Sequence, residues 1–213
     1  KVQRTKERPI ASGKISIVGA LIYIILLCSI ALLILLQFNS LTITLGMSSM
    51  ILAFAYPFMK RITYWPQLFL GLTFNWGIIM GWTSISNSIS IEPIILYLAA
   101  IFWTLGYDTI YGLQDMYDDE IIGIKSTSIK FKNNAKVFVG TCYSLCVLFV
   151  LILCLMMEID KYLLALSIFF ISTLIYQIKF FKIDNPKSCL VAFKINNLTG
   201  IFVFLFIFSF TIS

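Results

Sequence analysis

The sequence contains no histidine, and its five cysteines form no C-x-x-C pair. Without histidine, the chain cannot provide a histidine ligand to haem or a Ser/His or Cys/His catalytic pair. A zinc site of the usual cysteine and histidine type is excluded for the same reason. The side chains left for chemistry are mainly carboxylates, lysines and arginines.

Charge is also scarce, since 12% of the residues are charged while 60% are hydrophobic and the mean hydropathy is +0.94. A soluble domain could not bury so many apolar side chains, so lipid must surround most of the chain. The net charge of +6 does not require a nucleic-acid partner, because basic residues commonly flank membrane spans. We therefore expect a lipid bilayer, and no nucleic acid, around this protein.

Long apolar runs predict an all-α, polytopic transmembrane helical bundle that forms one domain over residues 1–213. A helix needs about 20 residues to cross a bilayer. Seven runs approach or reach that length, at residues 15–37, 41–58, 67–86, 92–112, 136–157, 161–180 and 190–212.

The basic residues are distributed unevenly over the connections between these runs. With seven spans, all of the sixteen Lys and Arg residues except Lys161 fall on one side of the membrane. The positive-inside rule assigns that side, which also holds the N-terminus and the acidic stretch, to the cytoplasm. Because the composition is rich in Ile, Phe, Lys and Asn, we expect a bacterial inner membrane.

The acidic residues are concentrated in residues 107–131, which read YDTIYGLQDMYDDEIIGIKSTSIKF. Half of the ten carboxylates of the chain lie between Asp108 and Glu120. On a helix, Asp115 and Asp119 would share a face with Cβ atoms about 5–6 Å apart. Such a pair can hold Mg²⁺ while phosphate oxygens fill its open positions. The alternative is a solvated loop whose acids border the membrane.

The other segments on this side are basic, namely KVQRTKERPIASGK at 1–14 and YPFMKRITYWPQ at 56–67. Carboxylates that hold a metal, together with fixed cations, suit a metal-bridged diphosphate. If the diphosphate is a leaving group, neutralising its charge promotes its departure.

The stretch YDTIYGLQDMYDDEIIGIKST resembles the second aspartate-rich motif of the UbiA-type intramembrane prenyltransferases. Within that family, it is most similar to the branch that acts on 4-hydroxybenzoate in ubiquinone synthesis. The stretches YPFMKRITYWPQLFLGLTFNWG and RTKERPIASG resemble other segments of the same branch. The resemblance extends over essentially the whole chain.

This resemblance implies a fold of nine spans around a central cavity that opens sideways to lipid. It implies Mg²⁺-dependent transfer of a polyprenyl group from polyprenyl diphosphate to the ring of 4-hydroxybenzoate. Asp115 and Asp119 match the motif's D-x-x-x-D and would bind the metal, and Arg61 is the third expected catalytic residue. The residues expected to contact the substrates are Asp108, Lys60, Lys125, Tyr111 and Arg8.

The chain departs from the family pattern before residue 1, where the family's first motif, N-D-x-x-D-x-x-x-D, should stand. We therefore expect two helices and that motif to be missing, so that the chain is either a fragment, with an upstream N-terminal segment as a partner, or a degraded relative. We also expect little catalysis from these 213 residues alone.

Two other functions stay open. The acceptor could be another quinone precursor or a porphyrin, as in haem modification. Alternatively, the chain could be a non-catalytic truncated membrane protein or a transporter that uses its acidic residues.

Overall fold

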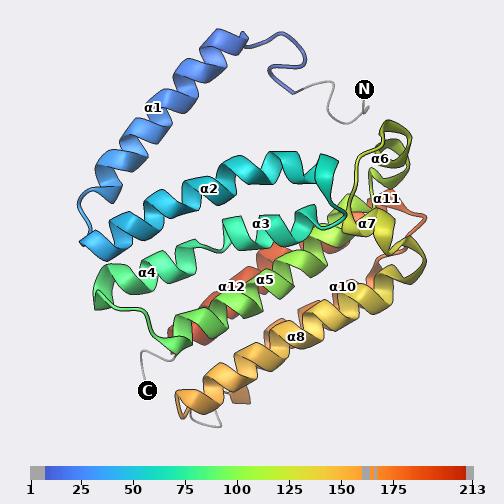
Figure 1. Ribbon diagram of the computed structural model, residues 1–213. Coiled ribbons are helices and arrows are strands. Elements are labelled where there is room, and N and C mark those ends of the chain that lie inside the picture. The colour runs from blue at the N-terminus through green and yellow to red at the C-terminus, as the bar shows by residue number, and fades with distance from the viewer. Residues whose placement is uncertain (1–7, 160–163, 166, 210–213) are drawn as a thin grey trace.

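The computed structural model describes residues 8–159, 164–165 and 167–209, and these residues contain helices and no β-strand (Figure 1). The all-α expectation is therefore confirmed for the described residues. Their α-helices are α1 (Ile17–Leu35), α2 (Ser40–Ile62), α3 (Pro66–Phe74), α4 (Gly77–Ser86), α5 (Ile91–Gly112), α6 (Met116–Ile122), α7 (Thr127–Lys130), α8 (Ala135–Met156), α10 (Ser167–Phe180), α11 (Pro186–Lys194) and α12 (Asn196–Ser209). A short 3-10 helix, Lys132–Asn134, leads into α8.

Six helical segments in the described part of the chain are long and apolar enough to cross a bilayer. They are Ile17–Leu35, Ser40–Ile62, Pro66–Ser86, Ile91–Gly112, Lys132–Met156 and Pro186–Ser209. The seventh expected span, 161–180, is present as the 14-residue helix α10, and the start of that span lies outside the described residues. The protein is thus a multi-pass membrane protein, with six of the seven expected spans found at full length.

The starts of the helices are explained by local sequence. The side chains of Ser16 and Asn39 accept hydrogen bonds from the amides of Gly19 (3.0 Å) and Thr42 (2.9 Å), capping α1 and α2. Such caps satisfy amides that have no partner within the helix. Pro66 occupies the first position of α3, where its missing N–H costs nothing.

The third expected span is interrupted at Asn75, between α3 and α4. The Asn75 side chain donates hydrogen bonds to the carbonyl of Gly71 (2.9 Å) and to the hydroxyl of Thr104 in α5 (2.8 Å). A break at membrane depth is tolerated only where protein groups satisfy the polar atoms. Asn75 therefore connects the break to α5 by hydrogen bonds.

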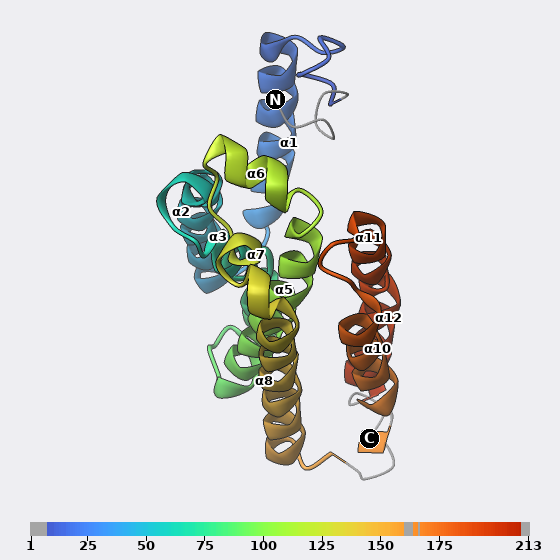
Figure 2. The ribbon, with the colours of Figure 1, turned by 90° about the vertical axis from the view of Figure 1, so that its right-hand side faces the viewer.

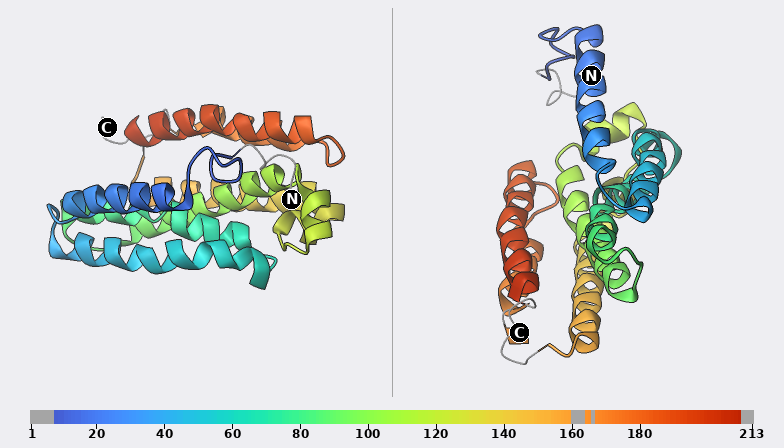
Figure 3. Two further views of the ribbon diagram at one scale, coloured as in Figure 1. Left: turned by 90° about the horizontal axis from the view of Figure 1, so that it is seen from above. Right: turned by 90° about the vertical axis from the view of Figure 1, so that its left-hand side faces the viewer.

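Helix α5 lies at the centre of the bundle and packs against α3, α4, α8 and α11. Close approach depends on small residues, since Gly71 of α3 rests against the backbone of Ile101 and Gly106 rests against the Tyr143 ring of α8. Figures 2 and 3 show α10, α11 and α12 as one group beside the rest, while α1 extends away from the bundle.

The helices run back and forth between two ends of the molecule. Figure 1 shows the end of α2, the end of α5, α6, α7 and α11 together at one end, with the connections after α1 and α4 at the other. The segments that the sequence marks as basic or acidic therefore meet at the same end, which positions the candidate site.

Candidate functional site

A polar cavity of about 330 Å³ lies at this end, where α2, α3, α5 and α6 meet. Its lining combines three carboxylates with two cations and several uncharged polar groups. The lining residues are Arg8, Tyr56, Lys60, Gln67, Asp108, Tyr111, Gly112, Asp115, Asp119 and Ser126. Six of the eight residues expected from the sequence thus face one cavity, here called the polar cavity.

Helix α2 contributes Tyr56 and Lys60, which are four residues apart and share a helical face. Arg61 follows directly and is rotated by about 100° around the helix axis. It is exposed and does not line the polar cavity. Because adjacent helical residues point in different directions, only one cation of the Lys-Arg pair faces this cavity.

Helix α5 contributes Asp108, Tyr111 and Gly112 from its last turn. The Tyr111 ring packs at a tilt against Phe193 of α11, with ring centroids 4.5 Å apart. Tyr107 also packs against Phe193, at 5.9 Å. These aromatic contacts connect the end of α5 to the C-terminal helices and orient Tyr111.

Asp115 and Asp119 border the polar cavity from the start of α6. Asp115 is the N-cap residue, and its carbonyl accepts a hydrogen bond from the Asp119 amide at 2.8 Å. The two residues are therefore separated by one helical turn, as their spacing predicts. Gly123, with φ of +79°, ends α6 in a left-handed conformation that suits glycine.

The other acids of this stretch have different surroundings. Asp118 is exposed and does not line the polar cavity. Glu120 forms an ion pair with Lys132, with 2.6 Å between Oε1 and Nζ. A lysine of the chain thus neutralises one acid of this stretch, and three of its five carboxylates line the polar cavity.

Lys125 supports the site from outside the lining. Its amide donates a hydrogen bond to the Lys60 carbonyl at 2.8 Å, and its ammonium donates one to the Ile62 carbonyl at 3.2 Å. The ammonium also lies 5.6 Å from the centre of the Tyr64 ring. Lys125 therefore holds the segment after α6 against the end of α2, and its expected phosphate contact stays a prediction.

Sequence reasoning missed four lining residues, namely Tyr56, Gln67, Gly112 and Ser126. Tyr56 could have been found from its spacing to Lys60 on one helical face. Gln67 and Ser126 gave no comparable signal, because their role depends on the contact between α3 and α7 beside the end of α5.

A hydrogen-bonded cluster of buried hydroxyl groups lies beside the polar cavity. The hydroxyl groups of Thr109 and Thr127 are 2.7 Å apart, and the Ser128 hydroxyl donates to the Thr109 carbonyl at 2.8 Å. All three residues are fully buried. The cluster joins α7 to the last turns of α5 and fixes the segment that follows the acidic cluster.

The described residues contain no grouping of three or more His, Cys, Asp and Glu side chains that could hold a metal ion by themselves. Mg²⁺, however, is usually held by one or two carboxylates, with waters and substrate phosphates as its remaining ligands. The all-oxygen donors of Asp115 and Asp119, on one turn at the edge of the polar cavity, fit this second arrangement.

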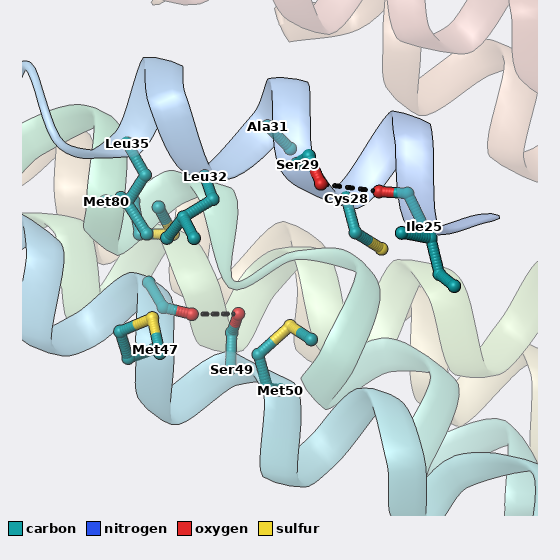
Figure 4. Close-up of a pocket in the computed structure, with 11 residues that line it drawn as sticks. Ile25, Cys28, Ser29, Ala31, Leu32, Leu35, Met47, Ser49, Met50 and Met80 are labelled. Atoms are coloured by element: carbon teal, nitrogen blue, oxygen red, sulfur yellow. Dashed lines mark hydrogen bonds between the residues drawn. The ribbon is translucent and has the colours of Figure 1, made fainter. Parts of the chain in front are cut away.

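A second cavity, of about 480 Å³, lies between α1, α2 and α4 and is lined mainly by apolar side chains (Figure 4). Leu32 and Leu35 of α1 face Met47 and Met50 of α2, and Met80 comes from α4. Its serines bond within their own helices, as Ser29 does to the Ile25 carbonyl at 2.8 Å. This cavity has no charged group and cannot hold a diphosphate.

Comparison with known proteins extends these observations. Residues 1–209 match the model of the UbiA prenyltransferase family. Proteins named mitochondrial 4-hydroxybenzoate polyprenyltransferase are 41% identical in Drosophila melanogaster and in Homo sapiens, each over 208 residues. These alignments cover 96% of this chain and 53% and 56% of the two relatives. The protein with the same name from Arabidopsis thaliana is 49% identical over 139 residues, 65% of this chain and 34% of that protein.

The chain therefore spans about half the length of the curated relatives it matches. These relatives are named mitochondrial, so they do not support the expected bacterial membrane. A solved structure of a UbiA homolog from Aeropyrum pernix K1 has a TM-score of 0.78 and 18% identity, covering 95% of this chain and 78% of that one. The match over nearly the whole chain shows that the chain belongs to the UbiA prenyltransferase family, and the shared helical fold agrees with it.

Proposed function

We propose that this chain forms most of the catalytic domain of a Mg²⁺-dependent enzyme that transfers a polyprenyl group from polyprenyl diphosphate to the ring of 4-hydroxybenzoate. Its family membership and the names of its relatives support this reaction. The observation that carries the proposal is the polar cavity, whose lining combines Asp108, Asp115 and Asp119 with two cations at the end of an apolar bundle.

In this proposal, Asp115 and Asp119 would hold Mg²⁺, which would supply positive charge to the diphosphate. Lys60 and Arg8 add fixed cations within the same cavity. Their charges stabilise the negative charge that develops on the leaving group, and such stabilisation is strongest where water is excluded. Asp108 helps to bind the metal-bridged substrate.

The reaction proceeds by cleavage of the allylic C–O bond, whose electron pair leaves with the diphosphate. The ring carbon ortho to the phenol oxygen then forms the new C–C bond, since that oxygen donates electron density into the ring. The ring proton is then lost to the released diphosphate or to water, which restores aromaticity. An apolar surrounding protects the allylic cation from water, and the helices beside the polar cavity supply it.

We also propose an orientation in the membrane. The end with the polar cavity carries most of the basic connections, so the positive-inside rule places it in the cytoplasm of a bacterium or in the matrix of a mitochondrion. The composition favours the inner membrane of a bacterium, and the names of the relatives favour a mitochondrial membrane.

The test measures prenylation of 4-hydroxybenzoate by membranes that contain residues 1–213, and by membranes in which the upstream part of a relative is joined to them. We expect Mg²⁺-dependent product from the joined form. Replacing Asp115 with Asn should lower turnover by about a hundredfold or more, because a charge acting on the transition state is lost.

The matched control is Asp118→Asn, which removes an acid that is three residues away and exposed. It should leave turnover near the wild-type value. Unchanged turnover in the Asp115→Asn protein would contradict the proposal, and a higher rate with another quinone precursor or a porphyrin would change the acceptor.

A further inference from the structure

Gln67 is a buried polar residue at the edge of the polar cavity that the proposed reaction does not yet use. It is the second residue of α3, directly after Pro66, and its side chain is 4% exposed. A polar group in such a position loses free energy unless it has hydrogen-bond partners. The partners of its two amide atoms therefore decide what it does.

The orientation of the Gln67 amide is defined by one contact. Its Oε1 accepts a hydrogen bond from the backbone N–H of Thr127 at 3.0 Å. An N–H group can bond only to the oxygen of the amide, so the Nε2 donor must lie on the other side. There it lies next to Gly112, where a Cβ atom would be 3.4 Å from Nε2.

The anchor of this amide is itself rigid. Thr127 is fully buried, and its hydroxyl is 2.7 Å from that of Thr109 in α5. Ser128, the next residue, bonds to the Thr109 carbonyl. Because the Thr127 amide cannot move freely, the Gln67 side chain is held in one orientation before any substrate binds.

The Nε2 donor is available to a ligand. Among the described residues, the hydrogen bonds of Gln67 include the one at Oε1 and none donated by Nε2. Nε2 is also not one of the side-chain atoms that are fully buried and lack a hydrogen-bond partner. It is therefore accessible from the polar cavity that Gln67 lines with Lys60 and Asp108.

We propose that the Gln67 side chain is a substrate-binding group, whose Nε2 donates a hydrogen bond to an anionic oxygen of a substrate. This inference rests on the proposed function. The oxygen belongs to the diphosphate or to the carboxylate of the aromatic acceptor, which share the chemistry that an amide donor recognises. A fixed donor of this kind binds without the entropy cost of ordering a flexible side chain.

The decisive variant is Gln67→Glu. A glutamate keeps the length of the side chain and the oxygen that accepts from Thr127, but it replaces the donor with a second, negatively charged acceptor. The control is Thr42→Val, which removes a buried hydroxyl that bonds to that of Thr83 at the start of α2, at the other end of this helix from Lys60 and outside the lining of the polar cavity.

Binding is measured by the rise in unfolding temperature of detergent-solubilised protein with inorganic pyrophosphate plus Mg²⁺, and separately with 4-hydroxybenzoate. Ligands that bind the folded state stabilise it by an amount that grows with the logarithm of one plus the ratio of ligand concentration to Kd, so at one ligand concentration a weaker binder raises this temperature less. Both residues 1–213 and the form with a restored upstream segment are measured, together with KM for each substrate in the active form.

We expect Gln67→Glu to weaken binding of one ligand, and to raise its KM, by about tenfold or more. Thr42→Val should lower the unfolding temperature without ligand and leave both affinities unchanged. Weaker pyrophosphate binding assigns the contact to the diphosphate, and weaker 4-hydroxybenzoate binding assigns it to the acceptor.

Other outcomes would overturn the inference in distinguishable ways. If a folded Gln67→Glu protein kept the wild-type affinities, the proposed contact would be ruled out, while the proposed reaction would stand. Equal losses of affinity in Gln67→Glu and Thr42→Val would show that Gln67 acts only through the stability of the fold. If the wild type bound neither ligand, the proposed function would fail with it. If Gln67→Glu did not fold, the same measurements would be made on Gln67→Asn, whose side chain is too short to make both contacts.

Discussion

Helices α1 and α5 are both long and apolar enough to span a membrane, yet α1 lies on the outside of the protein and α5 lies at its centre. None of the residues in the most apolar window of α1 is buried within the protein, whereas half of those in α5 are. The more hydrophobic of the two helices is α1. Hydrophobicity therefore measures the affinity of a helix for lipid, and it says little about how far the helix packs inside the bundle.

The difference between the helices lies in small and polar residues. The buried face of α5 includes Ala99, Thr104, Gly106 and Thr109. In lipid, helices gain little from burying apolar surface against each other, so close packing and interhelical hydrogen bonds hold them together. Helix α1 has large aliphatic side chains on all sides, and its packing against α2 is sparse.

The substitution with the largest expected effect on stability enlarges a small residue of α5. In Gly106→Leu, the new side chain would collide with the Tyr143 ring of α8. We expect a loss of stability of about 3 kcal/mol, at the upper end of overpacking effects, and a sharply lower yield of folded protein. Thermal unfolding in detergent measures it.

The matched change in α1 is Ala31→Leu, at an exposed position. Ala31 borders the apolar second cavity between α1, α2 and α4. We expect no loss of stability, because this cavity leaves room for the larger side chain. Equal destabilisation by the two substitutions would show that α1 packs as tightly as α5.

A second prediction compares two leucines. Leu105 in α5 is 3% exposed and Leu33 in α1 is 64% exposed. Truncation of Leu105 to Ala should lower stability by about 2 kcal/mol, since it leaves a cavity in a packed interior. Truncation of Leu33 should change stability by less than about 0.5 kcal/mol.

Unfolding of both variants by denaturing detergent, starting from the same micelles, tests this difference. A Leu33→Ala protein as unstable as Leu105→Ala would contradict it.

The smallest expected effect concerns a single hydrogen bond. Thr104→Val keeps the shape of a buried side chain in α5 but removes the hydroxyl that accepts from Asn75 at 2.8 Å. We expect a loss of about 0.5–1 kcal/mol, the usual range between membrane helices. Asn75 keeps its bonds to the carbonyls of Gly71 and Ala100, which limits the effect.

Ser29→Ala in α1 is the counterpart, because the Ser29 hydroxyl bonds within its own helix. It should unfold at the wild-type temperature. A larger effect for Ser29→Ala than for Thr104→Val would reverse the assignment of interior and lipid-facing helices.

Much of the candidate site could be predicted from the sequence. Asp108, Asp115 and Asp119 stand out because acids are rare in this chain, and all three line the polar cavity. Lys60 and Arg61 could not be separated from composition alone. Their places around α2 separate them, since Lys60 lines the cavity and Arg61, on another face of the helix, does not.

The breaks inside the spans were not predicted. The run at 67–86 is mostly apolar. Its hydropathy does not reveal the hydrogen bonds that Asn75 makes to α5. The run at 190–212 contains a similar break between α11 and α12. There the Asn196 side chain accepts from Trp103 of α5 at 3.0 Å, a contact between residues far apart in the chain.

By itself, the sequence determined that the protein is helical, spans a membrane several times and collects its charged residues at one end. These properties follow from local composition and from spacing along the chain. The tertiary structure alone decided that α5 is the centre, that Gln67 and Ser126 join the acids around one cavity, and that Glu120 pairs with Lys132 instead. Such contacts join segments from different helices, and their geometry depends on how the helices pack, which spacing along one segment does not encode.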